Sequence, residues 1–110
     1  MAIIPRLTKA KSKNKLNSID ATLQILGDKW TALILAQISE QGLPFSKLES
    51  SLVGISPRTL SARLDKLQRE KIVEKTLYCK HPPRYRYSLT HKGQGLRDIL
   101  DMMSSWGSRS

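Results

Sequence analysis

The chain of 110 residues has little of what disulfide-bonded, membrane-spanning and metal-binding proteins need. Its single cysteine, Cys79, excludes an intramolecular disulfide and favours a reducing compartment. No apolar run approaches the length of a membrane span, and Met1–Arg6 is too short an apolar start for a signal peptide, so we expect a cytoplasmic protein. Two histidines, His81 and His91, add too few ligands for a zinc site, and we expect neither a metal nor a cofactor.

Catalytic arrangements are missing from the sequence as well. Serine and aspartate are present, but no general base stands at the spacing of a known catalytic motif. Gly93-Gln94-Gly95 opens an expected helix without the lysine or the third glycine of a phosphate-binding loop. We therefore expect a protein that is not an enzyme.

Acidic residues are scarce: nine stand against 19 Lys and Arg, which gives a formal net charge of +10. The excess is unevenly distributed. Residues 1–17 carry five basic groups and no acid, and residues 56–86 carry nine basic and three acidic groups, whereas residues 18–55 are net −2. Clustered positive charge is typical of a protein that binds a polyanion, although charge alone also fits a merely soluble basic protein.

Two terminal segments flank the expected globular domain, residues 18–107. Residues 1–17 contain alternating lysines without an apolar period, which predicts a basic, flexible arm. An arm that lies along phosphates or enters a minor groove is the alternative. Residues 108–110 are expected to be a short C-terminal tail.

The domain should begin with two helices. An apolar stripe at helical spacing predicts the first over residues 18–26. Asp28 follows as a good N-cap for the second, from Lys29 to about Ser39. That second helix is apolar on most sides, so we expect it to be the central buried helix, with Trp30 anchored in the core.

Residues 46–70 are the most informative stretch, because they fit two capped helices joined by a tight glycine turn. Ser46 and Glu49 have the spacing of a capping box for the first helix. Gly54 suits the left-handed backbone that ends a helix. Ser56-Pro57 opens the second helix as its N-cap and first helical residue. This order indicates a helix-turn-helix.

The second helix of this motif, about residues 57–70, has the composition of a DNA recognition helix. Leu60, Leu64 and Leu67 form a stripe to be buried, and basic and hydroxyl side chains lie on the other side around the small Ala62. Such a face suits entry into a major groove, and an ordinary solvated basic face is the alternative. The DNA-contacting residues expected from the motif are Ser46, Lys47, Ser56, Arg58, Thr59, Ala62, Arg63 and Lys66.

An alternating pattern follows, which predicts a β-hairpin over about residues 73–89 with the stiff tip Pro82-Pro83. A hairpin directly after a helix-turn-helix is a wing. Arg84 and Arg86 share one face of it, and with Lys80 near the tip they are candidates for contacting backbone phosphates or a minor groove. We expect the wing tyrosines to pack against the core.

The C-terminal segment predicts a long helix from Thr90 to about Trp106 with one continuous apolar stripe. So small a domain has little surface of its own to cover this stripe. We therefore expect a two-fold dimer interface formed with the first helix, and packing within one chain is the alternative. The expected interface residues are Ile19, Leu23, Leu96, Ile99, Leu100, Met103 and Trp106.

Several of these motifs occur together in one family. They are Gly27-Asp28-Lys29-Trp30-Thr31, the turn Gly54-Ile55-Ser56-Pro57-Arg58, and the strand end Arg84-Tyr85-Arg86-Tyr87-Ser88-Leu89-Thr90. On these residues the chain resembles the HxlR-type winged helix-turn-helix transcriptional regulators over residues 18–107. The resemblance implies a mainly α fold with a small β-wing (α+β), and a homodimer held by its N- and C-terminal helices. It implies Ser56, Arg58, Thr59 and Arg63 at the DNA, with Arg84 and Arg86 in the wing.

One departure from the family concerns cysteine. Several members sense oxidants or electrophiles through a cysteine just before the first helix, where this chain has Leu16-Asn17-Ser18. Thiol sensing at that position is therefore not expected. Cys79 lies in the wing instead, next to the basic residue Lys80. It is a candidate redox residue, although an incidental cysteine is the favoured interpretation.

The sequence as a whole predicts a sequence-specific transcriptional regulator, expected to be a repressor, that binds double-stranded DNA as a homodimer on a palindromic operator. The recognition helix would enter the major groove, and the wing would lie on the flanking backbone or minor groove. The alternative is a nonspecific architectural protein that uses the lysine-rich arm. No residue identifies a small-molecule inducer.

Overall fold

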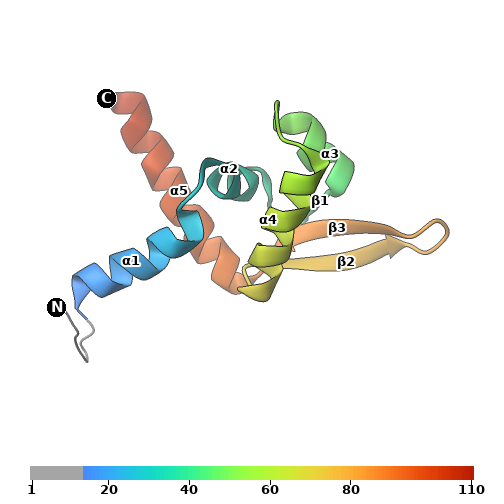
Figure 1. Ribbon diagram of the computed structural model, residues 1–110, viewed down its shortest axis with the longest axis horizontal. Coiled ribbons are helices and arrows are strands. Elements are labelled where there is room, and N and C mark those ends of the chain that lie inside the picture. Colours follow the sequence, from blue (N-terminus) through green and yellow to red (C-terminus); the bar gives the residue numbers. More distant parts are fainter. Residues whose placement is uncertain (1–13) are drawn as a thin grey trace.

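The computed structural model describes residues 14–110, which form five helices and a three-stranded antiparallel sheet of order β1-β3-β2 (Figure 1). The elements are α1 (Lys15–Leu26), α2 (Lys29–Gln37), β1 (Leu43–Pro44), α3 (Phe45–Ser51), α4 (Pro57–Arg69), β2 (Val73–Cys79), β3 (Arg84–Leu89) and α5 (His91–Arg109).

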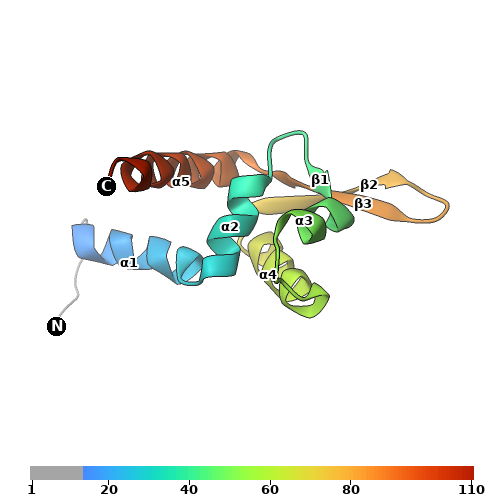
Figure 2. The same ribbon diagram turned by 90° about the horizontal axis from the view of Figure 1, so that it is seen from above.

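These elements form three parts along the long axis of the molecule. The helices α2, α3 and α4 and the base of the sheet make up the centre (Figure 1). The β2–β3 hairpin extends from one side of this centre, and α1 and the outer half of α5 extend from the other (Figure 2). A mainly helical chain with a helix-turn-helix followed by a β-hairpin is a winged helix, so the predicted fold class is confirmed.

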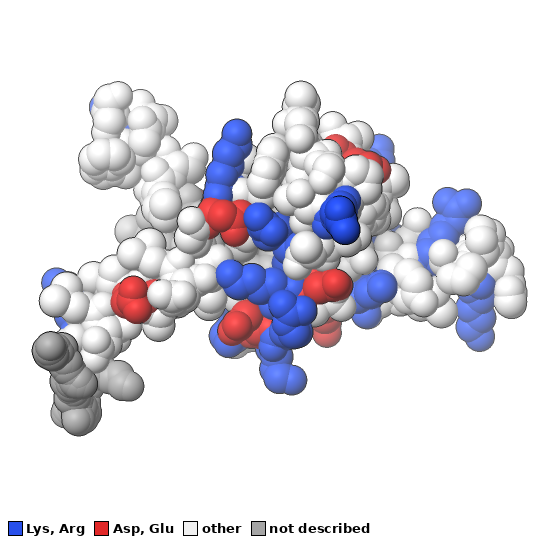
Figure 3. Space-filling model, in the orientation of Figure 1, with Lys and Arg blue, Asp and Glu red and all other residues white. Residues whose placement is uncertain are grey.

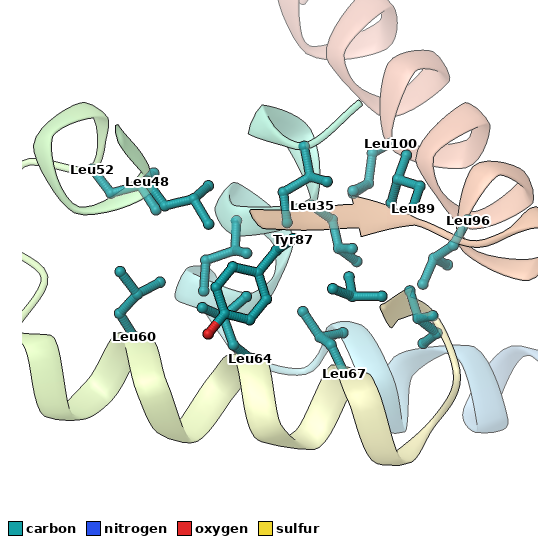
Figure 4. Close-up of a cluster of buried hydrophobic side chains, with 14 of the residues drawn as sticks. Leu35, Leu48, Leu52, Leu60, Leu64, Leu67, Tyr87, Leu89, Leu96 and Leu100 are labelled. Carbon is teal, nitrogen blue, oxygen red and sulfur yellow. The ribbon is translucent and has the colours of Figure 1, made fainter. Parts of the chain in front are cut away.

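The core lies where α2, α3 and α4 meet the base of the sheet and the first half of α5. Leu60, Leu64 and Leu67 of α4 are almost fully buried, which confirms the predicted stripe. Figure 4 shows these leucines pointing from α4 toward α2 and β3. The other buried apolar residues are Ile34, Leu35, Ile38, Leu48, Leu52, Ile55, Ile72, Val73, Tyr87, Leu89, Leu96 and Leu100.

The second helix is central, as its composition predicts. α2 packs against α1, α3, α4 and α5, and it buries Thr31, Ile34 and Leu35. It ends at Gln37, slightly earlier than expected. Trp30 is partly buried and packs against the edge of the core rather than in its middle.

Three predicted helix starts and the predicted turn form as expected because each depends on neighbouring residues. The side chains of Asp28, Ser56 and Thr90 accept hydrogen bonds from the third backbone N–H that follows each of them. These bonds satisfy donors that have no partner inside the helix. Gly54 has a φ of 95°, in the left-handed region that favours glycine, and it lies in the turn between α3 and α4.

The expected capping box at Ser46 is not formed. α3 begins at Phe45 with Pro44 at its N-cap, and no side chain caps it. The sheet explains this difference, because Pro44 pairs with Arg86 of β3 and the chain passes directly from strand to helix. Ser46 therefore lies inside the first turn, where its hydroxyl is exposed.

The first helix begins earlier than the sequence suggested. Asn14 is its N-cap, with the side-chain Oδ1 accepting a hydrogen bond of 2.9 Å from the backbone N of Asn17. Residues 14–17, the last part of the predicted arm, therefore belong to the start of α1. The rest of the predicted arm lies outside the described residues.

The wing is buried at its base and exposed toward its tip. β2 and β3 pair from Val73 opposite Leu89 to Cys79 opposite Arg84, with a register shift near Cys79. Of the wing tyrosines only Tyr87 packs in the core, so the expectation that they all do so is wrong for the other two. Tyr78 and Tyr85 lie further out, beyond the reach of the core, and are exposed.

Candidate nucleic-acid interface

Basic side chains gather over α4 in the centre of the face shown in Figure 3, and again along the wing. The outer end of α5 is mostly uncharged in the same view (Figure 3). Because the leucine stripe of α4 is turned into the core, the opposite side of this helix is open to solvent. The predicted contact residues Ser56, Arg58 and Ala62 are exposed there. α4 therefore presents a positive, exposed surface that fits a polyanion.

Arg58 is an available cation on this face. It is exposed and makes no hydrogen bond or ion pair with any residue of 14–110. Its neighbours Ser56 and Thr59 are joined instead, because the Ser56 Oγ accepts from the Thr59 backbone N at 3.0 Å and donates to the Thr59 Oγ1 at 3.0 Å. Both hydroxyl groups thus serve the helix cap in the free protein.

Arg63 lies on the flank of α4 that faces α2. Its Nε donates a hydrogen bond of 3.1 Å to Oδ1 of Asp28, with which it forms an ion pair. Burial raises the pKa of the Asp28 carboxyl, whereas hydrogen bonds from Thr31 and Arg63 and the positive charge of Arg63 lower it. The lowering effects together are larger, so the pKa lies below its ordinary value. The sequence placed Arg63 at the DNA without indicating this partner, which is 35 residues away.

Lys66 is held in a similar way one turn further along α4. Its Nζ donates a hydrogen bond of 3.0 Å to the backbone carbonyl of Gln24, in the last turn of α1. The carbonyl groups at a helix C-terminus lack partners within the helix and attract cations. In the free protein Lys66 is therefore engaged with α1, and the predicted DNA contact would require it to leave this carbonyl.

The wing places its three candidate cations differently. Lys80 and Arg84 are exposed near the tip. Arg86 lies against the sheet instead, with its guanidinium 4.8 Å from the centre of the Tyr78 ring. Its Nε is buried and makes no hydrogen bond within the described part of the chain. Arg84 is thus the wing arginine best placed to reach a phosphate, and Arg86 supports the sheet.

The predicted contact residues of the first motif helix lie beside the wing. Ser46 and Lys47 are exposed at the start of α3. Ser46 and Arg84 line the same groove, which has a volume of about 270 Å³ and is otherwise walled largely by aromatic rings and prolines. The structure therefore brings these two predicted residues together from elements far apart in the sequence.

The predicted dimer residues divide into two groups. Leu96 and Leu100 are buried in the core of the single chain, so their assignment to a dimer interface is wrong. They lie on the first half of α5, where the sheet and α2 cover the helix. The remaining predicted residues are substantially exposed: Ile19, Leu23, Ile99, Met103 and Trp106.

The exposed apolar residues of α1 and α5 lie on two helices at the same end of the molecule, and four of them share a groove. Ile19 and Leu23 from α1 and Ile99 and Met103 from α5 line a shared groove of about 270 Å³. Two further apolar side chains, Leu16 and Met102, are more than 70% exposed, and the sequence analysis did not single them out. We call this surface the α1–α5 apolar face.

Cys79 is the only cysteine, and it is partly buried at the outer end of β2. Within residues 14–110, no helix is long and apolar enough to cross a membrane. In the same part of the chain, no cluster of three or more acidic, histidine or cysteine side chains has the arrangement of a metal site.

Comparison with known proteins agrees with this geometry. The family model described as HxlR-like helix-turn-helix matches residues 25–110. The chain is 35% identical over 100 residues to the regulatory protein MalR of Fusobacterium mortiferum, covering 89% of this chain and 94% of that protein. It is 37% identical over 89 residues to the HTH-type transcriptional regulator YvaP of Bacillus subtilis strain 168, covering 81% and 82%.

A solved structure is similar over almost the whole fold. It is a regulator of the MarR family from Enterococcus faecalis V583, with a TM-score of 0.81, 27% sequence identity and 93% of each chain covered. The chain is thus a transcriptional regulator with a DNA-binding helix-turn-helix fold, and it belongs to the HxlR-like helix-turn-helix family.

Proposed function

We propose that this regulator binds a palindromic operator as a homodimer and represses transcription there. The observation that carries the proposal is the exposed basic face of α4, which lies opposite a fully buried leucine stripe and beside the exposed cations of the wing. α4 enters the major groove, where Arg58 and Ala62 approach the base edges. Arg84 and Lys80 contact the flanking phosphates or minor groove.

The α1–α5 apolar face supports the homodimer. Seven large apolar side chains are left exposed on α1 and α5, two helices that lie at the same end of the molecule (Figure 2). A second copy related by a two-fold axis covers this face with the same face of its own. The two α4 helices of such a dimer reach successive major grooves about 34 Å apart, which matches a palindromic operator.

The test is selection of bound sequences from fragmented genomic DNA by the purified protein at about physiological salt, where nonspecific binding to phosphates is weak. The expected result is an inverted repeat whose half-sites lie about one helical turn apart. Enrichment of single, unpaired sites would contradict the dimer. Absence of any enriched sequence would contradict operator binding.

Repression is the expected effect of a dimer bound to an operator that overlaps a promoter. A protein that covers two successive major grooves excludes RNA polymerase from a promoter that overlaps the operator. Transcription in vitro from a template carrying the selected operator is expected to fall when the protein is added. A rise in transcription would instead indicate an activator.

The second candidate is nonspecific binding through the basic N-terminal segment, and the five basic groups of residues 1–17 favour it. Since α1 begins at Lys15 with its cap at Asn14, deleting residues 1–13 removes four of these five basic groups and keeps every residue of the described helices and strands. Retained operator preference would support the first proposal. Loss of nearly all DNA binding would support the second.

A further inference from the structure

We propose that Asp28 is a positioning residue for DNA recognition: through Arg63 it fixes the rotation of α4 about its own axis. This inference rests on the proposed function, since it concerns how α4 is presented to an operator. It assigns a role in DNA reading to a side chain that lies on another helix, at the start of α2.

The Asp28 carboxylate is itself held in place. Its Oδ1 accepts from the backbone N of Thr31 at 3.0 Å, and its Oδ2 accepts from the Thr31 hydroxyl at 2.8 Å. Thr31 is fully buried. Oδ1 also accepts from the Nε of Arg63 at 3.1 Å. Because three hydrogen bonds converge on one carboxylate, its direction is fixed, and the Arg63 side chain is fixed with it.

A second contact acts on the same flank of α4. Lys66, three residues after Arg63, donates to the carbonyl of Gln24 at 3.0 Å. The two anchoring points are thus about 4.5 Å apart along the helix axis. Asp28 and Gln24 lie on either side of the α1–α2 corner, so both anchors belong to one piece of structure.

The polar contacts of Arg63 and Lys66 add a directional restraint to the leucine stripe, because apolar contacts are not directional whereas hydrogen bonds have a preferred geometry. Side-chain ends lie about 5–6 Å from a helix axis, so a rotation of about 10° moves them by about 1 Å. A displacement of this size takes a hydrogen bond to a base edge out of its optimal range. Arg58 and Ala62 are on the face that would move.

The test compares Asp28→Ser, Arg63→Met and the double variant. Serine still caps Thr31, because it is a good N-cap, but it cannot pair with Arg63. Asp20→Ser is the matched control, since Asp20 is an exposed aspartate of α1 and its loss changes the net charge equally. Each protein is measured on the selected operator and on a scrambled duplex of the same length, over a range of salt concentrations.

The expected result is a loss of discrimination without a loss of charge contacts. Asp28→Ser and Arg63→Met each lower operator affinity relative to the scrambled duplex by about tenfold, comparable to one misplaced base contact. The double variant loses no more than the larger single loss, because both changes break one connection. The Asp20→Ser control keeps the wild-type ratio.

A direct contact between Arg63 and DNA gives a different pattern. Arg63→Met would then lower affinity for both duplexes and reduce the salt slope by about one, whereas Asp28→Ser would leave the ratio unchanged. That pattern would overturn the inference. So would additive losses in the double variant.

A measurement on the free protein separates this inference from the proposed function. If the wild type selects no operator, the proposed function fails, and the amide NMR chemical shifts of α4 decide the question that remains. Asp28→Ser and Arg63→Met are expected to move the amide signal of Arg58, more than one helical turn from Arg63, in the same direction. An unchanged Arg58 signal in both variants would show that Asp28 does not set the orientation of α4.

Discussion

α1 and α4 are helices of similar length, 12 and 13 residues, and each carries an apolar stripe, yet one chain covers only one of them. α4 buries three leucines, whereas α1 buries none of its residues. The difference shows that the DNA-binding half of the molecule is completed within a single chain. The other half, built on α1 and the end of α5, still exposes apolar area that a second copy could cover.

The strongest test of this contrast is the same substitution in the two helices. Leu64→Ala removes a buried side chain and is expected to lower the free energy of unfolding by about 2–5 kcal/mol. Leu23→Ala, at a half-exposed position, is expected to cost much less in dilute protein, and more as the concentration rises. Urea denaturation at two protein concentrations measures both. Equal costs at low concentration would break the comparison.

The contrast is sharpened by blocking the α1–α5 apolar face. Met103→Asp places a charge on this face and is expected to convert the proposed dimer to a monomer, because a buried unpaired charge is costly. Affinity for the full operator should fall about a hundredfold or more, while affinity for a single half-site stays the same. Sedimentation and DNA titration measure the two effects. Ser105→Asp, on the other side of α5, is the control that should change neither.

The free face of α4 gives a smaller effect. Arg58→Ala is expected to lower operator affinity by about 1–3 kcal/mol and to leave binding to unrelated DNA nearly unchanged. Arg84→Ala in the wing should weaken both equally and reduce the salt slope by about one. Fluorescence anisotropy against salt concentration distinguishes the two. If both variants weakened every duplex alike, Arg58 would not be a base-reading residue.

The smallest effect is expected at Asp28, which lies at the corner between α1 and α2 and pairs with Arg63 of α4. Hydrogen bonds and Arg63 lower the pKa of Asp28 in the folded protein, despite the opposing effect of burial. Its contribution to stability is therefore complete above the ordinary carboxyl pKa of 3.8 and is lost as the pH falls through the lower folded value. Thermal unfolding between pH 2 and pH 5 (about the range of carboxyl titration) should show a shallower decline for Asp28→Asn than for wild type. Parallel curves would contradict the assignment.

The features of the fold that sequence analysis predicted correctly depend on short stretches of chain. Asp28, Ser56 and Thr90 bond to residues three positions away, and the left-handed angle of Gly54 is a property of the turn itself. The failure at Ser46 has the opposite origin. Whether this residue caps a helix depends on strand β1, which forms only because β3 arrives from much later in the chain.

The candidate site follows the same division. The helical spacing of α4 correctly placed its leucines inward and Arg58 outward. It could not show that Arg63 and Lys66 have partners 35 and 42 residues away. Helical periodicity gives the direction in which a side chain points, but it does not identify the residue that the side chain contacts. Leu96 and Leu100 were misassigned for a related reason. One stripe runs along α5, but the core ends halfway along it, and sequence spacing does not show where.

The start of α5 is packed directly against the base of the wing. A side chain at Gly93 would collide with the carbonyl oxygen of Ile72, so the first turn of α5 lies directly on the residue that precedes the wing. Thr90 reinforces this junction, with its Oγ1 donating to the carbonyl of Lys71 at 2.7 Å. The base of the wing and the start of α5 are therefore joined by direct contacts. In the proposed dimer, these contacts link the wing to the helix that carries part of the dimer interface.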